Sequence, residues 1–166
     1  EFYRFLGRDG TTVDLSRLSL TNTRLWSEDV VYRDNTGRLE ITSTTSSPIR
    51  ADRDIEIRSG GGDDTIALNG AVAAGRDVTM LLQGGLDLVS STAQLSATDG
   101  TIYIDLSEGI VPEDLERGQR AAQSLTVEQA GLSAGNDVVI LASGLAPVTI
   151  QVEEELSAGR DIVIRT

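Results

Sequence analysis

The 166-residue sequence contains no cysteine, no histidine and no lysine, and only six aromatic residues. Without cysteine or histidine the chain cannot form disulfides, thiolate nucleophiles, imidazole-based catalytic triads or zinc sites that use those ligands. It also lacks an apolar run of about 18 residues, the length that a membrane-spanning helix needs. The sequence therefore predicts no membrane span.

Positive charge is also scarce, and all of it comes from arginine. The sequence has 26 acidic and 14 basic residues, so its formal net charge is −12. Nucleic acids and anionic membranes attract proteins that carry a basic surface. We therefore expect no nucleic-acid partner.

A short pattern, an alanine followed three residues later by an aspartate and an alternating apolar strand, recurs along the chain. Its alanine recurs at residues 51, 74, 97, 134 and 158, at intervals of 23, 23, 37 and 24 residues. A period of this size is typical of a solenoid. Fainter copies at residues 7–15 and 26–32 bring the number of starts to seven, so residues 1–166 are predicted to form a single domain.

Each copy supplies three segments whose apolar residues alternate with other residues, as they do in strands with one buried face. The inward positions after the aspartate are Val30 and Tyr32, Ile55 and Ile57, Val78 and Met80, Ile102 and Ile104, Val138 and Ile140, and Ile162 and Ile164. Those of the next strand are Leu18 and Leu20, Leu39 and Ile41, Ile66 and Leu68, Leu86 and Leu88, Leu125 and Val127, and Val148 and Ile150. Those before the alanine are Ile49, Val72, Leu95, Leu132 and Leu156.

Three inward segments per turn predict an all-β fold. We expect a single-stranded parallel β-helix of about seven rungs with a period of about 23 residues, right-handed as parallel strand connections generally are. The 37-residue interval is longer than the period, and its excess falls in residues 108–123. Pro112 and the later Arg117 and Arg120 suit a short helix. Residues 108–123 are therefore predicted to project as a loop or short helix.

Aspartates recur at one position of the repeat and would form a column in the stack: Asp29, Asp54, Asp77, Asp137 and Asp161. Carboxylates about 5 Å apart repel by roughly 3 kcal/mol at an effective dielectric constant of 20. One interpretation is that each accepts hydrogen bonds from backbone N–H groups of its own turn and lies near Arg53, Arg76 or Arg160. The other is a bound cation such as calcium.

Calcium could also involve the glycine-rich stretch at residues 59–68. Its Asp63 and Asp64 follow three glycines, as in half of a calcium-binding nonapeptide. That motif needs tandem copies and occurs here once, so a glycine-rich corner between two strands is the other interpretation. The calcium candidates are thus Asp54, Asp77, Asp63 and Asp64, and otherwise no cofactor is predicted.

Acidic residues such as Asp52, Asp54 and residues 153–155 raise the alternative of a polysaccharide-acting enzyme. Such an enzyme needs carboxylates that converge in a groove. These residues are scattered over turns, and the chain offers no histidine or lysine as a general base. The sequence therefore predicts a non-catalytic protein.

The motif Leu-Ser-Ala-Gly-Arg-Asp-Ile-Val-Ile at residues 156–164, with variants at 72–80 and 132–140, resembles the repeats of filamentous-haemagglutinin-type adhesins of Gram-negative bacteria. Similar repeats occur in two-partner-secreted exoproteins. The resemblance implies a right-handed β-helix that is extracellular or at the cell surface. It implies a role in adhesion, with carbohydrate or a host or neighbouring cell surface as a partner.

Both ends of the sequence suggest self-assembly. The last copy ends directly after its first strand, and the aromatic residues Phe2, Tyr3 and Phe5 crowd an N-terminal segment at residues 1–6. An open strand edge and an exposed aromatic cluster are liabilities in a monomer. We expect Phe2, Tyr3, Phe5, Ile162 and Ile164 to form a head-to-tail interface between copies. The alternatives are that the chain is a fragment of a large adhesin, or that it binds a ligand through residues 108–123.

Overall fold

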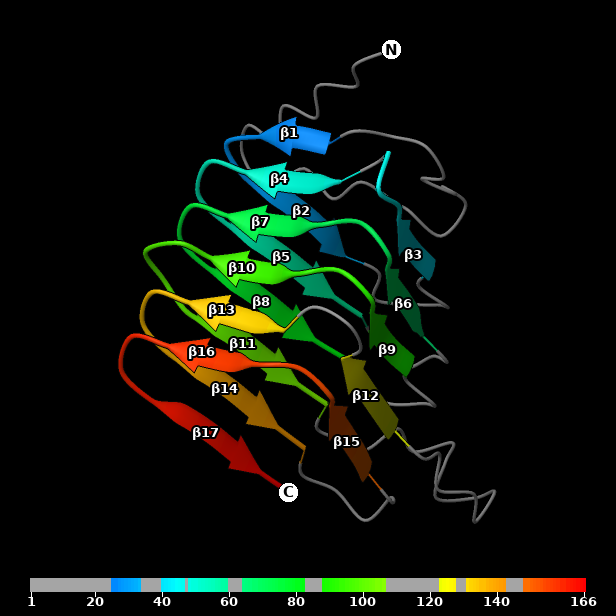
Figure 1. Ribbon diagram of the computed structural model, residues 1–166. Coiled ribbons are helices and arrows are strands. Elements are labelled where there is room, and N and C mark those ends of the chain that lie inside the picture. The colour runs from blue at the N-terminus through cyan, green and yellow to red at the C-terminus, as the bar shows by residue number, and fades with distance from the viewer. Residues whose placement is uncertain are drawn as a thin grey trace.

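The computed structural model describes residues 25–33, 40–46, 48–59, 64–82, 88–106, 123–127, 131–142 and 148–166, which form three parallel β-sheets (Figure 1). The first sheet contains β1 (Leu25–Ser27), β4 (Ile49–Ala51), β7 (Val72–Ala74), β10 (Leu95–Ala97), β13 (Leu132–Ala134) and β16 (Leu156–Ala158). The second contains β2 (Val30–Arg33), β5 (Ile55–Arg58), β8 (Val78–Leu81), β11 (Ile102–Asp105), β14 (Val138–Leu141) and β17 (Ile162–Arg165). The third contains β3 (Glu40–Ser43), β6 (Thr65–Leu68), β9 (Leu88–Ser91), β12 (Gln123–Val127) and β15 (Val148–Val152).

The chain visits the three sheets in turn and returns to the first one rung further along, so it winds as a right-handed coil (Figure 1). Each strand inside a sheet pairs in parallel with the equivalent strands of the rungs before and after it, for example β8 with β5 and β11. Every element of the described ranges is a strand. The predicted all-β parallel solenoid is therefore confirmed, although the copy at residues 7–15 lies outside the described residues.

Apolar side chains stack in columns along the axis of the coil, because equivalent residues of successive rungs are in register. One such column is Tyr32, Ile57, Met80, Ile104, Ile140 and Ile164. Its members from Ile57 to Ile140 are 0% exposed. The sequence prediction of inward positions is confirmed in the second sheet from Val30 to Ile140 and, where burial is described, in the first sheet up to Leu132. The core lies between the three sheets.

The phase predicted for β9 is wrong. Leu88 was expected to point inward but is 43% exposed, whereas Val89 is 3% exposed and pairs with the buried Ile66. Ser91, the next inward residue, is buried, and its hydroxyl donates to the carbonyl oxygen of Ala93 at 2.6 Å. An inward serine is not recognised by a pattern of apolar residues. The leucines on either side of Asp87 therefore suggested that Leu88, rather than Val89, points inward.

Two boundaries also differ from the sequence prediction. In the copy at 26–32, Ser27 rather than Trp26 takes the alanine position, because Ser27 pairs with Ala51. That turn is one residue shorter than the turn after Ala51. The predicted projection at 108–123 lies outside the described residues except for Gln123, which belongs to β12 and pairs with Val148.

Candidate functional site

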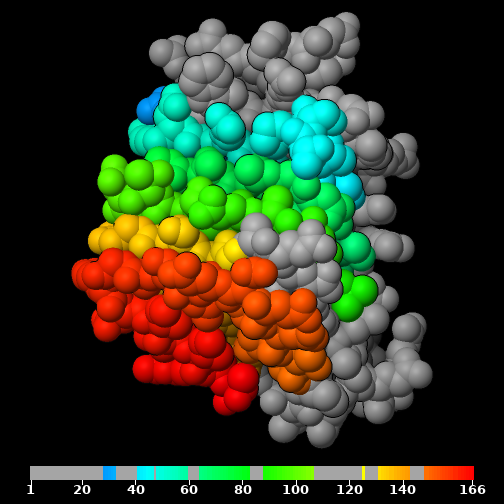
Figure 2. Space-filling model, viewed as in Figure 1, coloured from blue at the N-terminus to red at the C-terminus, as the bar shows by residue number. Residues whose placement is uncertain are grey.

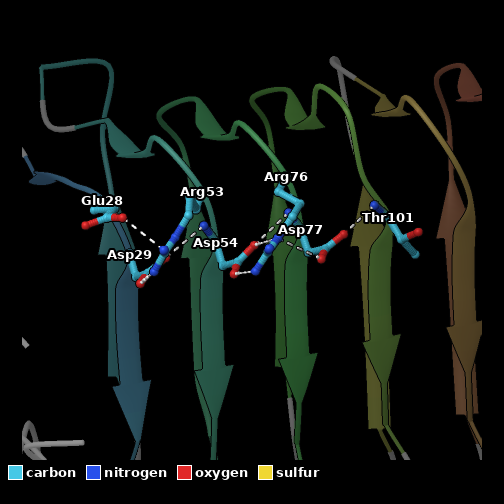
Figure 3. Close-up of polar contacts among 7 residues, drawn as sticks. All are labelled: Glu28, Asp29, Arg53, Asp54, Arg76, Asp77 and Thr101. Atoms are coloured by element: carbon cyan, nitrogen blue, oxygen red, sulfur yellow. Dashed lines mark hydrogen bonds and ion pairs between the residues drawn. The ribbon is translucent and has the colours of Figure 1, made fainter. Parts of the chain in front are cut away.

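The aspartate column lies along the turn that joins the first sheet to the second, and it forms a ladder with arginines of the following rungs (Figure 3). In the best-formed step, Arg76 Nε donates to Asp54 Oδ1 at 2.8 Å and Arg76 Nη2 donates to Asp54 Oδ2. The backbone N–H of Asp77 also donates to Asp54 Oδ1, at 3.2 Å. A planar guanidinium thus binds both oxygens of the carboxylate, the geometry in which an ion pair is most directional.

The same bidentate contact recurs in two other steps of the ladder. Arg53 Nε donates to Asp29 Oδ1 at 3.0 Å, and Arg160 Nε donates to Asp137 Oδ1 at 3.2 Å. In both steps the Nη2 atom donates to the second oxygen, and the backbone N–H of the following aspartate donates to Oδ1. We call this unit, an aspartate bound by the arginine and the backbone of the next rung, the inter-rung fork.

One described step replaces the arginine with the backbone alone. The turn after Ala97 is one residue longer, and the backbone N–H of Thr101 donates to Asp77 Oδ1 at 2.8 Å. Gly100 makes this approach feasible, since a Cβ atom there would lie 2.3 Å from Asp77 Oδ1 and 2.2 Å from the carbonyl oxygen of Arg76. The next step has no carboxylate, and there the side-chain Nδ2 of Asn136 donates to the carbonyl oxygen of Asp99 at 3.1 Å. The interruption at Gly100 therefore affects two steps of the column.

The glycines that precede the arginines are fixed by contact with the rung before. A Cβ atom on Gly75 would lie 2.0 Å from the carbonyl oxygen of Asp52, and one on Gly159 would lie 2.0 Å from the carbonyl oxygen of Gly135. Any side chain at these positions would push neighbouring turns apart. Both residues of the Gly-Arg pair thus contact the preceding rung, the glycine through its close approach to a carbonyl oxygen and the arginine through its bond to an aspartate.

Electrostatics follow from the fork geometry. The hydrogen bond from Arg53 is the largest of the causes that lower the pKa of Asp29 below its usual value. Hydrogen bonds to Asp29 and Asp54 likewise raise the pKa of Arg53 and Arg76 above the usual value for arginine. Each arginine therefore offsets the repulsion between stacked carboxylates.

This geometry supports the hydrogen-bonding interpretation of the aspartates, with one correction. The backbone donors were expected within each aspartate's own turn, but they come from the next rung. Within the described ranges no group of three or more acidic residues is placed to hold a metal ion. Of the other calcium candidates, Asp64 is 0% exposed directly before β6, and Asp63 lies outside the described residues.

The final rung differs from the rungs before it in its exposure. Ile162 is 47% exposed and Ile164 is 46% exposed, whereas Val138 and Ile140, their partners in the preceding rung, are both 0% exposed. Figure 2 shows this rung, in red, at one end of the layered stack. The exposed side chains of this rung therefore occupy positions whose equivalents in the preceding rung are buried. Phe2, Tyr3 and Phe5, predicted to cover such a face, lie outside the described residues.

The sequence placed Asp161 in the aspartate column but gave no reason to distinguish it from the other members. Its backbone N–H donates to Asp137 Oδ1 at 3.2 Å, as in an ordinary step of the ladder. Its side chain is exposed, and the described residues give its carboxylate no hydrogen bond or ion pair. The position in the repeat was visible in the sequence, but the need for a partner on the following rung was not.

Comparisons with protein-family models, with curated proteins and with solved structures found no match for this chain. Among the described residues there is no helix long and apolar enough to cross a membrane.

Proposed function

We propose that this protein is a non-catalytic structural protein of the bacterial cell surface whose coil is extended end to end by further copies. The observation that carries the proposal is that Ile162 and Ile164 are about half exposed on β17, which has a described strand on only one side. The β-helix itself supports a structural role, since its stacked rungs form a rod. The resemblance of residues 156–164 to adhesin repeats supports an extracellular location in a Gram-negative bacterium.

The open end favours the addition of another rung. Strands β15, β16 and β17 each pair with only one described strand, so among the described residues each has one edge whose backbone groups lack a strand partner. Covering Ile162 and Ile164, each about half exposed, would recover roughly 1.5 to 3 kcal/mol in total. New backbone hydrogen bonds along three strands would add to this.

We assign the covering rung to a second copy of this chain. A parallel strand at the usual spacing of about 4.8 Å would continue each sheet without any change of geometry. The N-terminal segment with Phe2, Tyr3 and Phe5 is the proposed covering segment, since it offers apolar surface to the exposed isoleucines. Because such a contact joins two different surfaces and need not close, it propagates into a filament.

Light scattering over a range of protein concentrations, with electron microscopy of the same samples, tests this proposal. We expect the wild-type chain to associate as concentration rises, and Ile164→Arg to remain monomeric because it places a charge on the covered face. Val31→Arg is the matched control, since Val31 is 45% exposed on the outward face of β2, which lies at the opposite end of the second sheet from β17. A wild-type chain that remains monomeric at every concentration would refute the proposal.

A further inference from the structure

We propose that Asn69 is a site of spontaneous deamidation whose rate is controlled by Ser43 of the preceding rung. Asn69 and Gly70 directly follow β6, and they are the one asparagine–glycine pair in the sequence. The reaction converts a neutral side chain into the negative one of aspartate or of β-linked isoaspartate. It needs only water as a co-reactant and does not depend on contact between copies.

The sequence places the reacting atoms next to each other. In this reaction the backbone nitrogen of the following residue loses its proton and attacks the side-chain Cγ of asparagine. The bond from Cγ to the amide nitrogen breaks, ammonia leaves, and water opens the cyclic imide at either carbonyl to give aspartate or isoaspartate. A side chain on the following residue hinders the attack, and Gly70 has none. Asn69 is exposed, so water reaches it.

Close packing between rungs requires this glycine, so the fold retains the reactive pair. A Cβ atom on Gly70 would lie 1.8 Å from the carbonyl oxygen of Thr44 in the preceding rung. Any side chain at this position would push the two turns apart. A glycine after Asn69 is therefore a condition of the stack, and protection from deamidation must come from neighbouring residues.

Ser43 restrains the attacking group. Ser43 is 1% exposed, and its Oγ accepts a hydrogen bond from the backbone N–H of Gly70 at 3.1 Å and donates to the carbonyl oxygen of Gly70 at 2.9 Å. The backbone N–H of Asn69 also donates to the carbonyl oxygen of Ser43, at 3.0 Å. The Gly70 nitrogen can attack only after its bond to Ser43 breaks, because that bond holds the proton that must leave.

The group under attack is held by a different rung. Thr92 Oγ1 of the following rung donates to Asn69 Oδ1 at 2.9 Å. The attacking nitrogen is thus bound to the rung before and the side-chain amide to the rung after, so the closed stack disfavours their approach. Deamidation at Asn69 therefore requires local opening, and the population of the open turn sets its rate.

Mass spectrometry of peptides from protein kept at mildly alkaline pH tests the proposal. We expect Ser43→Ala to deamidate at Asn69 about ten-fold faster than the wild type, the effect of losing one buried hydrogen bond from the closed turn. Ser91→Ala is the matched control, because Ser91 is buried at the equivalent position two rungs later. Its hydroxyl donates to the carbonyl oxygens of Leu68 and Ala93, and we expect this variant to react at the wild-type rate.

Unfolded wild-type protein provides a second measurement that needs no variant. In concentrated urea Asn69 should react at least about ten-fold faster than in the folded chain, since the turn is then always open. Asn136 is the internal standard and should react far more slowly in urea, because the side chain of Asp137 hinders the same attack.

Circular dichroism and thermal melts establish which variants fold. Equal deamidation rates in Ser43→Ala and Ser91→Ala would overturn the role of Ser43. If Ser43→Ala does not fold, equal rates at Asn69 in folded and unfolded wild-type protein would overturn the protection by the stack. Absence of reaction at Asn69 in urea would overturn the site itself.

Discussion

Replacement of one central residue of the isoleucine column measures how much the stack depends on its core. Ile104 is 0% exposed and pairs with Met80 and Ile140, both also 0% exposed. Ile104→Ala removes three carbon atoms at a place where both neighbouring rungs are fixed by backbone pairing. Because the backbone on both sides limits collapse into the cavity, we expect the upper half of the usual range, about 3 to 5 kcal/mol.

The same substitution at the end of the same column provides an internal standard. Ile164 is 46% exposed, so Ile164→Ala should cost about 1 to 2 kcal/mol, less than half of the effect at Ile104. Val139→Ala, on the outward face of β14, should cost less than about 1 kcal/mol. For a chain of this length, 4 kcal/mol corresponds to a fall of roughly 8 to 16 °C in melting temperature.

Urea denaturation followed by circular dichroism is the appropriate measurement, at protein concentrations below the onset of association. The midpoint should fall in the order wild type, Val139→Ala, Ile164→Ala and Ile104→Ala, with an unchanged dependence on urea. Equal losses at Ile104 and Val139 would contradict the assigned strand phase. Equal losses of unfolding free energy for Ile104→Ala and Ile164→Ala would contradict the expectation that a more exposed residue of the column contributes less to stability.

Three further predictions concern the turns. Gly75→Ala should destabilise the chain by about 1 to 3 kcal/mol or more in the same urea assay, because its Cβ atom would lie 2.0 Å from the carbonyl oxygen of Asp52; a neutral result would mean that the turns can separate freely. The pKa of Asp29 is lowered by Arg53, so Asp29 stabilises the fold above its unfolded pKa and loses this effect as pH falls through its folded pKa. Asp29→Asn should therefore be less stable than the wild type at neutral pH and equal to it in strong acid; a deficit that persists in acid would point to packing instead. A chelator should leave the melting temperature within about 2 °C, and a larger fall that calcium but not sodium reverses would favour the cation interpretation.

The fold could be predicted from the sequence because the period and the alternation are both strong. Apolar residues such as Val78 and Met80 mark the inward face of their strand, and equivalent residues do so in other rungs. Because each strand has one apolar face, the alternation shows which of its residues point inward. The prediction was wrong at Leu88 for a physical reason. The inward column of the third sheet contains Ser43 and Ser91, both buried, and Ser43 Oγ donates to the carbonyl oxygen of Gly70 at 2.9 Å. Buried polar residues whose hydroxyls donate to turn carbonyls cannot be recognised as inward positions from the hydrophobicity of the sequence.

The candidate site could be predicted only in part. The aspartate column and its nearby arginines follow from the repeat, because equivalent positions must stack. The direction of each contact does not follow, since only the register shows that Arg76 binds Asp54 of the preceding rung in a bidentate fork.

The inter-rung fork gives the rod a polarity. In each described fork the carboxylate belongs to the earlier rung and the guanidinium to the later one, as in Asp54 with Arg76. The described forks therefore all point the same way along the axis of the coil. A filament built by end-to-end addition would keep this direction throughout, so its two tips would be chemically distinct.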